Sequence, residues 1–427
     1  MADLRCELAG IRSPNPFWLA SAPPTDKEYN VVRGFKAGWG GVVWKTLCED
    51  PPVVNVSSRY GAVSLNGQRM VGFNNIELIS DRPLEINLAE IKRVKRDWPD
   101  RAVVVSLMVP CDEESWKRIL ARVEDTGADG VELNFGCPHG MSERGMGSAV
   151  GQVPDYVEMV TRWCKRHTRM PVIVKLTPNV TNILAPARAA RAGGADAVSL
   201  INTVNSITAV DLDLMAPEPT VNGKGTHGGY CGPAVKPIAL HMVAEIARDP
   251  DCAGMPISAI GGISNWRDAA EFVALGATSV QVCTAVMHRG FRIVDDMIDG
   301  LGNWMDAAGY AGLDDFRGRA VANYVDWRRL DMNYEIVAEI DQRRCIKCGL
   351  CHIACEDTSH QAITARRVNG ERHYEVDAGE CVGCNLCMHV CPVEGCVTMR
   401  RVDNGKPYME WTDDPRNPDR VAGDAAR

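Results

Sequence analysis

Eight cysteines near the end of the chain have a spacing that suits metal binding. They form two runs, Cys345, Cys348, Cys351 and Cys355, then Cys381, Cys384, Cys387 and Cys391. Thiolates at this spacing are typical of domains that hold two [4Fe–4S] clusters, and the fourth cysteine of each run ligates the other cluster. We therefore expect Cys391 to join the first three cysteines of the first run, and Cys355 to join the first three of the second run.

A pair of zinc sites is the alternative, since zinc also uses CxxC pairs and eight cysteines would suit two ions. The third cysteine-to-cysteine step in each run and Pro392 after Cys391 favour the clusters. The stretch resembles a bacterial two-cluster ferredoxin domain, although Glu356 stands where that pattern has proline. A ninth cysteine, Cys396, is not expected to be a ligand. Because such clusters move single electrons, the remaining residues should hold a group that exchanges them.

The composition excludes several classes of protein. A chain of 427 residues with 45% hydrophobic residues suits two or three globular domains. A net charge of −8 gives no nucleic-acid footprint, and no apolar run of about 18 residues predicts a membrane span. The N-terminus lacks a signal-peptide pattern, and the other nine of the 17 cysteines are scattered through apolar stretches. We therefore expect reduced cysteines and a cytoplasmic location.

The elements that must position a site follow one repeated pattern over residues 1–310. Short β-rich runs alternate with amphipathic segments of helical length, which indicates βα units and a parallel sheet. The eight runs are Phe17–Ala22, Gly41–Leu47, Ala102–Val109, Val131–Cys137, Val172–Thr177, Ala197–Thr203, Ile257–Ile263 and Ser279–Val286. Eight such units predict an α/β fold of the (β/α)8 TIM barrel type. An open, doubly wound sheet is the alternative, but eight regular repeats favour closure.

The pattern also divides the chain. The predicted parts are a barrel over 1–310, a polar linker over 311–335, a small α+β ferredoxin-like domain over 336–402 and an extended tail over 403–427. Two long loops, 48–82 and 204–232, follow the second and sixth strands of the barrel, and loops of this length are usually functional or disordered. Residues 66–75 have the composition of an ordered lid.

Reactive and charged side chains follow the expected strands, at the end where barrel enzymes place their chemistry. Cys137 ends the fourth strand, and a glycine-containing stretch at 141–147 follows it as a predicted lid. Lys45 and Lys175 end two further strands, where a buried ammonium needs an anion unless it reaches solvent. The glycine pair at 261–262 favours a phosphate site, because glycine lets backbone N–H groups approach an anion. A flavin would satisfy both the lysines and the phosphate site.

These motifs resemble the flavin barrel of dihydropyrimidine dehydrogenases, which is related to class 1 dihydroorotate dehydrogenases. The matching stretches are NFGCPHG at 134–140, VKLTPN at 174–179, INT at 201–203, NNIELI at 74–79 and QVC at 281–283. The resemblance covers roughly residues 5–400 and includes the order of barrel, then ferredoxin domain. It implies the FMN and iron–sulfur catalytic subunit of a bacterial, NAD-dependent enzyme that reduces the 5,6-double bond of uracil or thymine.

The resemblance also implies a role for individual residues. It places FMN contacts at Ala20, Ser21, Lys45, Lys175, Gly229, Gly262, Cys283 and Thr284. It places the pyrimidine against Asn75, Glu77, Asn134, Asn202 and Thr203, and it makes Cys137 the catalytic acid on a mobile loop. Gly136 departs from the family, whose loop usually has serine at this position.

The chemistry of the residues agrees with these roles. Reduction of uracil requires a hydride at one carbon and a proton at the other, from the opposite face. A cysteine thiol, with a reference pKa of about 8.5, is mostly protonated at neutral pH and can supply that proton. Asparagine offers one acceptor and two donors, which suits the alternating N–H and C=O edge of the base. A buried structural thiol is the alternative for Cys137.

The chain offers no clear site for a nicotinamide cofactor. The sequence GKGTHG at 223–228 spells GxGxxG, but it neither leaves a strand directly nor opens a helix. We therefore expect a separate FAD subunit that oxidises NADH, in a hetero-oligomer with two copies of this chain.

Two other functions stay open at this point. One is a dihydroorotate dehydrogenase with a fused ferredoxin domain, which would need an extra cation for the substrate carboxylate near Asn75 or Asn202. The sequence shows no such cation. The other is a non-catalytic electron-transfer module, which Cys137 and the asparagines argue against.

Overall fold

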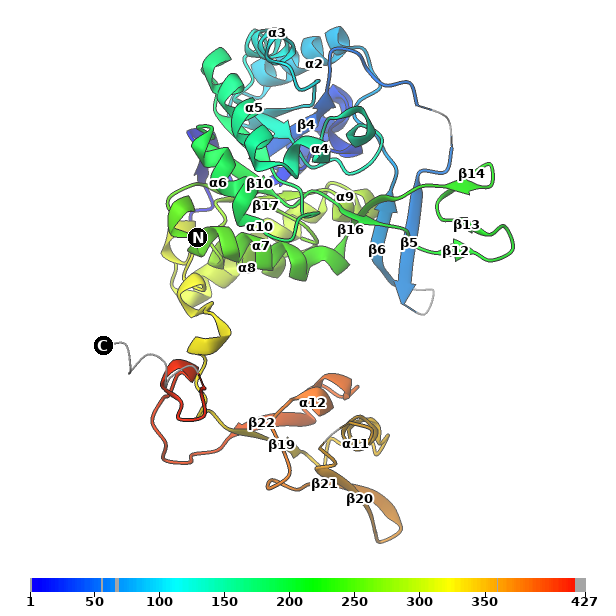
Figure 1. Ribbon diagram of the computed structural model, residues 1–427, viewed down its shortest axis with the longest axis vertical. Coiled ribbons are helices and arrows are strands. Elements are labelled where there is room, and N and C mark those ends of the chain that lie inside the picture. Colours follow the sequence, from blue (N-terminus) through cyan, green and yellow to red (C-terminus); the bar gives the residue numbers. More distant parts are fainter. Residues whose placement is uncertain (1, 55–56, 66–68, 359, 419–427) are drawn as a thin grey trace. The chain divides into compact units, whose positions relative to one another are not determined.

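A computed structural model describes residues 2–54, 57–65, 69–358 and 360–418 (Figure 1). The chain forms two compact units, Met1–Tyr324 and Val325–Arg427. The boundary falls inside the stretch 311–335, for which the sequence predicts a linker. In the described part of the chain, no helix is both long enough and apolar enough to cross a membrane.

Eight parallel strands close into a barrel in the first unit, which confirms the predicted fold class. Around the barrel they run in the order β10, β17, β18, β3, β4, β7, β8, β9. Their bounds are β3 Phe17–Leu19, β4 Gly41–Leu47, β7 Ala102–Leu107, β8 Gly130–Asn134, β9 Val172–Lys175, β10 Ala197–Leu200, β17 Ile257–Ile260 and β18 Ser279–Val282. Every residue of these strands is buried, because helices cover one face and packed side chains fill the other. Seven of the eight predicted runs extend past the C-terminal end of their strand, where the backbone turns into the site.

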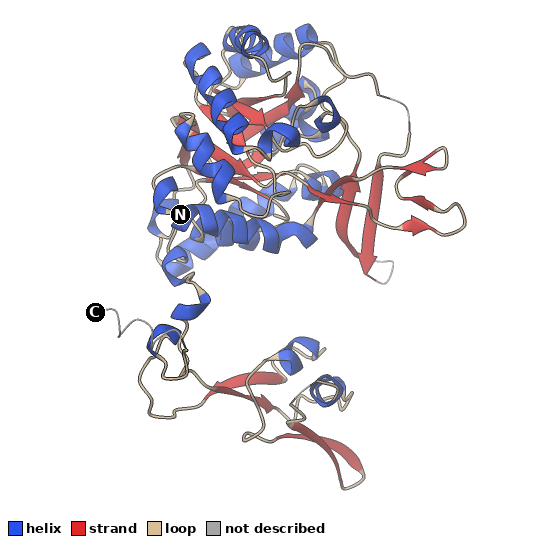
Figure 2. Cartoon of the chain, in the orientation of Figure 1, coloured by secondary structure: helices blue, strands red, loops and turns tan. Residues whose placement is uncertain are grey.

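Helices form the outer layer of this unit, as the predicted βα units require (Figure 2). They are α1 Glu28–Ala37, α2 Leu84–Asp97, α3 Glu113–Glu124, α4 Ser148–Gly151, α5 Pro154–His167, α6 Leu184–Ala192, α7 Lys236–Arg248, α8 Trp266–Ala274, α9 Thr284–Arg289 and α10 Ile293–Ala308. Side chains cap two of them at the N-terminus. The Asp112 carboxylate accepts a hydrogen bond from Ser115 N in α3, and the Asn265 amide oxygen accepts two bonds from the first turn of α8.

The two segments for which the sequence predicts long loops contain strands. The strands β5 Tyr60–Leu65 and β6 Arg69–Asn75 come from the first loop, and β11 Val204–Ser206 and β16 Gly228–Cys231 come from the second. Together they form an antiparallel sheet in the order β11, β16, β6, β5, which we name the accessory sheet. Residues 66–68 of the predicted lid lie outside the described residues. The sequence could not reveal this sheet, because its central pair joins residues about 150 positions apart.

A short N-terminal hairpin lies at the end of the barrel opposite the strand C-termini. Its strands are β1 Cys6–Leu8 and β2 Ile11–Ser13. Leu8 and Ile11 pack with Trp18, Val43 and other residues near the beginnings of the barrel strands. This apolar cluster closes that end of the barrel and leaves only the other end available for a ligand.

The described part of the second unit contains two antiparallel sheets of two strands each and two short α-helices. Strand β19 Ile336–Ile340 pairs with β22 Val397–Arg401, and β20 Ile363–Val368 pairs with β21 Glu371–Val376. Helix α11 Leu350–Glu356 begins one residue before Cys351, the third cysteine of the first run, and α12 Leu386–Val390 begins one residue before Cys387, the third cysteine of the second. After β22, the described part of the tail has one short 3-10 turn at Trp411–Asp413.

Candidate active site

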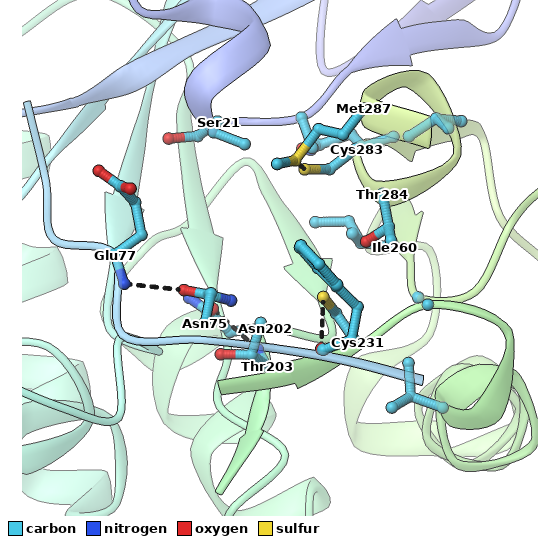
Figure 3. Close-up of a pocket in the computed structure, with 18 of the residues that line it drawn as sticks. Ser21, Asn75, Glu77, Asn202, Thr203, Cys231, Ile260, Cys283, Thr284 and Met287 are labelled. Atoms are coloured by element: carbon cyan, nitrogen blue, oxygen red, sulfur yellow. Dashed lines mark hydrogen bonds between the residues drawn. The ribbon is translucent and has the colours of Figure 1, made fainter. Parts of the chain in front are cut away.

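A large cavity opens at the C-terminal ends of the barrel strands. It contains about 1340 Å3 of space, part of which is open to solvent. Figure 3 shows Asn75, Asn202 and Thr203 at one side of this cavity and Cys283, Thr284 and Met287 at another. The cavity is therefore lined by residues from opposite parts of the sequence, as in other barrel sites.

Glu77 is the centre of a charged cluster on one wall of the cavity. Its carboxylate lies 3.1 Å from the Lys45 ammonium and 3.1 Å from the Arg59 guanidinium, and it accepts a hydrogen bond of 3.2 Å from the Tyr60 hydroxyl. Burial by itself would raise the pKa of Glu77, but the two cations outweigh it and hold the pKa below its usual value. The wall thus carries two cations around one ionised carboxylate, a net positive charge.

Arg59 corrects the expectation that no cation lies near Asn75. It comes from the segment before β5, where no sequence pattern marks it, and it reaches Glu77, two residues beyond Asn75. The closure of the accessory sheet brings it there, so its position depends on pairing between distant residues.

A second buried carboxylate lies beneath the cavity. Glu132 in β8 is completely buried, and one of its oxygens is 3.4 Å from the Lys175 ammonium in β9. Its other oxygen accepts hydrogen bonds from the Ser199 hydroxyl at 2.8 Å and the Gln281 amide at 3.1 Å. Because strands β8 and β9 are neighbours, their alternate side chains meet inside the barrel, which places Lys175 at the cavity floor with a compensating anion.

A chain of hydrogen bonds crosses the cavity between side chains of different strands. The Asn202 amide donates to the Asn134 oxygen at 3.0 Å, and the Asn134 amide donates to the Thr46 hydroxyl at 2.9 Å. Thr46 in turn lies 3.1 Å from the Ser21 hydroxyl. These bonds fix the orientation of the two asparagine amides. Asn75 is held separately, because its amide donates to the Gly229 carbonyl at 3.0 Å.

Gly136 allows Asn202 to lie where it does. A Cβ atom at position 136 would come within 2.4 Å of the Asn202 Cβ and 2.5 Å of its amide nitrogen. A serine, which the family usually has here, would therefore require Asn202 or the backbone to move.

Cys137 lies on the loop after β8 and is buried in the wall of the cavity. Burial raises the pKa of its thiol to about 11, so the thiol is protonated at neutral pH. The thiol donates a weak hydrogen bond of 3.5 Å to the His139 carbonyl. The His139 ring donates from Nε2 to the Glu77 carbonyl at 2.8 Å, which ties the cysteine loop to the charged wall.

The ends of β17 and β18 form another wall. Gly262 has a φ of +75°, and a Cβ atom there would come within 3.0 Å of the Gly232 carbonyl, so only glycine fits without a shift. Cys283, Thr284 and Arg289 line the same region, and the Arg289 guanidinium donates to the Ser264 carbonyl at 3.3 Å. Backbone amides, a hydroxyl and a guanidinium together suit a phosphate group.

All the predicted contact residues except Gly229 line this cavity. Gly229 lies behind Asn75 and contributes the carbonyl that holds it. The sequence analysis missed Tyr60, His139, His288 and Arg289, which line the cavity, and Arg59, which pairs with Glu77. His288 and Arg289 could have been found, because they lie in α9, the short helix that follows the eighth strand, in the region that binds phosphate in this fold.

The second unit brings its cysteines into two groups. Burial raises the pKa of the Cys351 thiol, and the nearby thiols Cys345, Cys348 and Cys391 raise it further. A small cavity is lined by Cys355, Cys381, Cys384 and Cys387, which is the other predicted group. The geometry therefore brings together the fourth cysteine of each run with the first three of the other. Cys396 is buried beside Cys345 and Cys391.

Comparison with known families agrees with both units. Residues 3–305 match the dihydroorotate dehydrogenase family, and residues 338–399 match the 4Fe-4S dicluster domain family. The second match confirms the predicted clusters in place of zinc.

Several characterised proteins are similar to the chain. It is 41% identical over 401 residues to the NAD-dependent dihydropyrimidine dehydrogenase subunit PreA of Escherichia coli (strain K12), a match that covers 94% of this chain and 96% of that protein. It is 39% identical to the chloroplastic dihydropyrimidine dehydrogenase (NADP+) of Arabidopsis thaliana, over 82% of this chain and 83% of that protein. It is 36% identical to the catalytic subunit of dihydroorotate dehydrogenase B (NAD+) of Pyrococcus abyssi, over 74% of this chain and 99% of that protein. The Pyrococcus protein thus has no counterpart of the remaining quarter of the chain.

Proposed function

The chain belongs to the dihydroorotate dehydrogenase family, and from that premise we propose that it is the catalytic subunit of an NAD-dependent dihydropyrimidine dehydrogenase. It reduces the 5,6-double bond of uracil or thymine and catalyses the reverse reaction. One observation carries the proposal. A buried, protonated Cys137 shares a cavity with the amides of Asn75, Asn134 and Asn202, in a chain whose similarity to a dihydropyrimidine dehydrogenase subunit extends through the dicluster domain.

The residues of the cavity fit FMN. Gly262, Thr284 and Arg289 would hold its phosphate, and Ala20, Ser21 and Cys283 would line the ring. Lys45 and Lys175 would lie at the polar edge of the ring, each beside one buried carboxylate, so that both ammonium groups stay compensated. When bound, FMN supplies the hydride for one carbon of the double bond.

The asparagines would bind the substrate. Asn134 and Asn202 are fixed by their mutual hydrogen bond, and each amide has further donor or acceptor capacity for the imide edge of the base. Asn75 and Thr203 would complete the pocket, and the Glu77 carboxylate would accept from a substrate N–H group. Preorganised amides lose little entropy when the base binds, which favours catalysis.

Cys137 would act as the general acid. Its thiol would donate the proton from Sγ to the second carbon of the double bond, on the face opposite the hydride. Burial keeps the thiol protonated, and the His139 contact with the Glu77 carbonyl positions the loop. In the reverse reaction the same sulfur would accept the proton.

Electrons would reach the barrel from a separate subunit. The eight cysteines would hold two [4Fe–4S] clusters, which supply single-electron transfer. The GxGxxG stretch forms the short strand β15 Lys224–Gly225 and the beginning of β16, and it opens no helix, so it does not resemble a dinucleotide site. We therefore assign NADH oxidation to an FAD subunit, in a hetero-oligomer that contains two copies of this chain.

Dihydroorotate oxidation is the second candidate, because the Pyrococcus relative has that name. Orotate carries a carboxylate, and the two cations nearest Asn75 are already paired with Glu77. A substrate carboxylate would therefore lie beside the ionised Glu77 carboxylate, whereas the neutral bases uracil and thymine can donate an N–H group to it, which favours these bases.

The test is an anaerobic titration of the purified chain with uracil and with orotate, while the absorbance of the flavin is followed. Uracil should perturb the spectrum at lower concentration than orotate. A Cys137→Ala variant should bind uracil with unchanged affinity but lose about 10²- to 10⁴-fold in turnover, which is the usual contribution of a general acid. A stronger response to orotate would favour the second candidate, and normal turnover of the alanine variant would assign the acid elsewhere.

A further inference from the structure

The two cysteine runs of the second unit are structural copies of each other. An aspartate stands four residues before the first cysteine of each run, Asp341 or Asp377. The backbone carbonyl of each aspartate accepts from the first cysteine N–H at 3.0 Å. Each side chain also accepts from the residue two positions on, at 2.9 Å for Arg343 and 2.8 Å for Gly379. Equivalent positions in the two runs can therefore be compared directly.

The copies differ in charge at these equivalent positions. The first has Arg343, Arg344 and Lys347, where the second has Gly379, Glu380 and Gly383. Lys347 has a φ of +62° and Gly383 a φ of +68°, so the lysine occupies a left-handed conformation that favours glycine. A lysine kept in this conformation indicates that its charge is useful at the first run.

Three arginines of the β20–β21 hairpin extend this positive surface. Arg367 and Arg372 lie directly opposite each other across the two strands, an arrangement that like charges disfavour. Both are exposed, and Arg372 has no ion pair with any residue that the structure describes. The third, Arg366, is paired with Glu375. An acidic partner would relieve the repulsion between Arg367 and Arg372.

The hairpin and the first cysteine run form one surface. Arg366, Arg367 and Arg372 line a concavity together with Cys348, an exposed cysteine of the first run. Gln342 connects the two parts, since its side chain accepts from Lys347 at 3.2 Å and donates to the Tyr374 carbonyl of β21 at 2.6 Å. We name Arg343, Arg344, Lys347, Arg367 and Arg372 the basic rim.

The surroundings of the second run carry the opposite charge. Glu356 and Asp357 follow Cys355, Glu380 precedes Cys381, and all three acidic residues are exposed. The domain is thus positive beside one set of cysteines and negative beside the other. Such a division gives a charged partner one preferred place to dock.

We propose that the basic rim is the docking surface for the electron-donating flavin subunit, which presents carboxylates around its redox group. The proposal rests on the proposed function and adds the site of electron entry, namely the first cysteine group at Cys348. Oxidation of one NADH to NAD+ by the partner releases two electrons and one proton. The electrons cross this surface one at a time, and two crossings supply the two electrons that one double bond takes up.

The test uses the full-length holoprotein, the flavin subunit purified separately after co-expression, and the double variant Arg367→Glu/Arg372→Glu. Binding of the subunit is measured against salt concentration, and uracil reduction is measured with NADH plus the subunit and with reduced methyl viologen alone. The double variant should bind about tenfold or more weakly, with a shallower salt dependence, while the viologen rate stays unchanged. Arg328→Glu, an exposed change of the same charge on the turn Trp327–Arg329, and Glu380→Lys beside the second run should bind as the wild type does.

Three outcomes would overturn the proposal. The first is that the double variant binds the flavin subunit as tightly as the wild type does. The second is that the double variant loses as much uracil reduction with viologen as with NADH plus the subunit. The third is that light scattering shows the double variant to have lost self-association of the chain, while it still binds the subunit. If the wild type failed to reduce uracil with viologen, the proposed function would fail, whereas the binding measurement would still decide on the basic rim.

Discussion

The buried pair of Glu132 and Lys175 gives the sharpest test of the barrel site. Replacement of Glu132 by glutamine keeps the shape of the side chain and its contacts with Ser199 and Gln281, but removes the charge that faces Lys175 at 3.4 Å. Lys175 itself is 5% exposed, so water cannot replace the lost anion. The substitution therefore isolates the electrostatic part of the pair.

The magnitude follows from the distance. Two unit charges 3.4 Å apart attract by about 5 kcal/mol at an effective dielectric constant of about 20. Loss of one partner of a buried pair costs about 3–5 kcal/mol in proteins, since the other charge remains buried. We expect Glu132→Gln to lower the free energy of unfolding of the barrel by that amount. Lys175→Met should cost a similar amount, because it leaves the carboxylate uncompensated.

The assay is denaturant unfolding of both single variants and the double variant, with and without saturating FMN. Removal of both charges leaves no buried ion, so the double variant should cost at least about 2 kcal/mol less than the sum of the single variants. FMN should stabilise the wild type more than Lys175→Met if the lysine contacts it. Strictly additive costs would refute the reasoning, because they would mean that the two charges do not interact.

Three further predictions follow from the same geometry. Because burial raises the pKa of Cys137 to about 11, its thiol keeps its proton up to roughly pH 10. The rate of uracil reduction that depends on Cys137 should therefore fall only as pH rises through about 11. A fall of the rate near pH 8 that Cys137→Ser abolishes would contradict this prediction. Gly136→Ser should raise KM for uracil and cost about 1–3 kcal/mol in stability by displacing Asn202. Gly302→Ala inside α10, where a Cβ meets nothing within 4 Å, should leave KM unchanged and raise stability by about 0.5–1 kcal/mol, since alanine favours a helix over glycine. Cys396→Ala should retain about eight irons per chain by metal analysis, since this thiol adjoins the expected ligands but lies outside the two cysteine runs. Cys391→Ala should lose about four irons. Equal losses in the two variants would make Cys396 a ligand.

The fold was largely predictable from the sequence, because a barrel strand is recognised by local composition. The eight predicted runs contain the observed strands except for Gly130 at the beginning of β8, and much of their excess length falls on residues that line the cavity. The accessory sheet was missed for a different reason. Its strands β6 and β16 read as loops, since β6 ends in two asparagines and β16 begins with two glycines, and the sheet forms only where these distant segments pair.

The candidate site divides in the same way. Sequence motifs mark Asn134, Lys175 and Asn202 as residues at strand ends. The barrel fold predicts that these strand ends meet at one end of the barrel. Arg59 and Tyr60 carry no such mark, since their place beside Glu77 depends on how the chain returns over the barrel mouth. His139 was visible only as a neighbour of Cys137, and its bond to the Glu77 carbonyl needs the folded loop.

The sequence by itself determined the dicluster domain and the number of βα units, and it predicted the cluster ligands, because all of these depend on spacing along the chain. Short intervals hold three thiols close enough to bind one cluster. The sequence shows these two-residue intervals directly, in the runs that begin at Cys345 and Cys381. The tertiary structure alone decided which charges meet. Closure of the barrel brings Glu132 to Lys175, and closure of the accessory sheet brings Arg59 to Glu77. Electrostatic interactions depend on distance in space, and for residues in different strands that distance is set by the closed sheet.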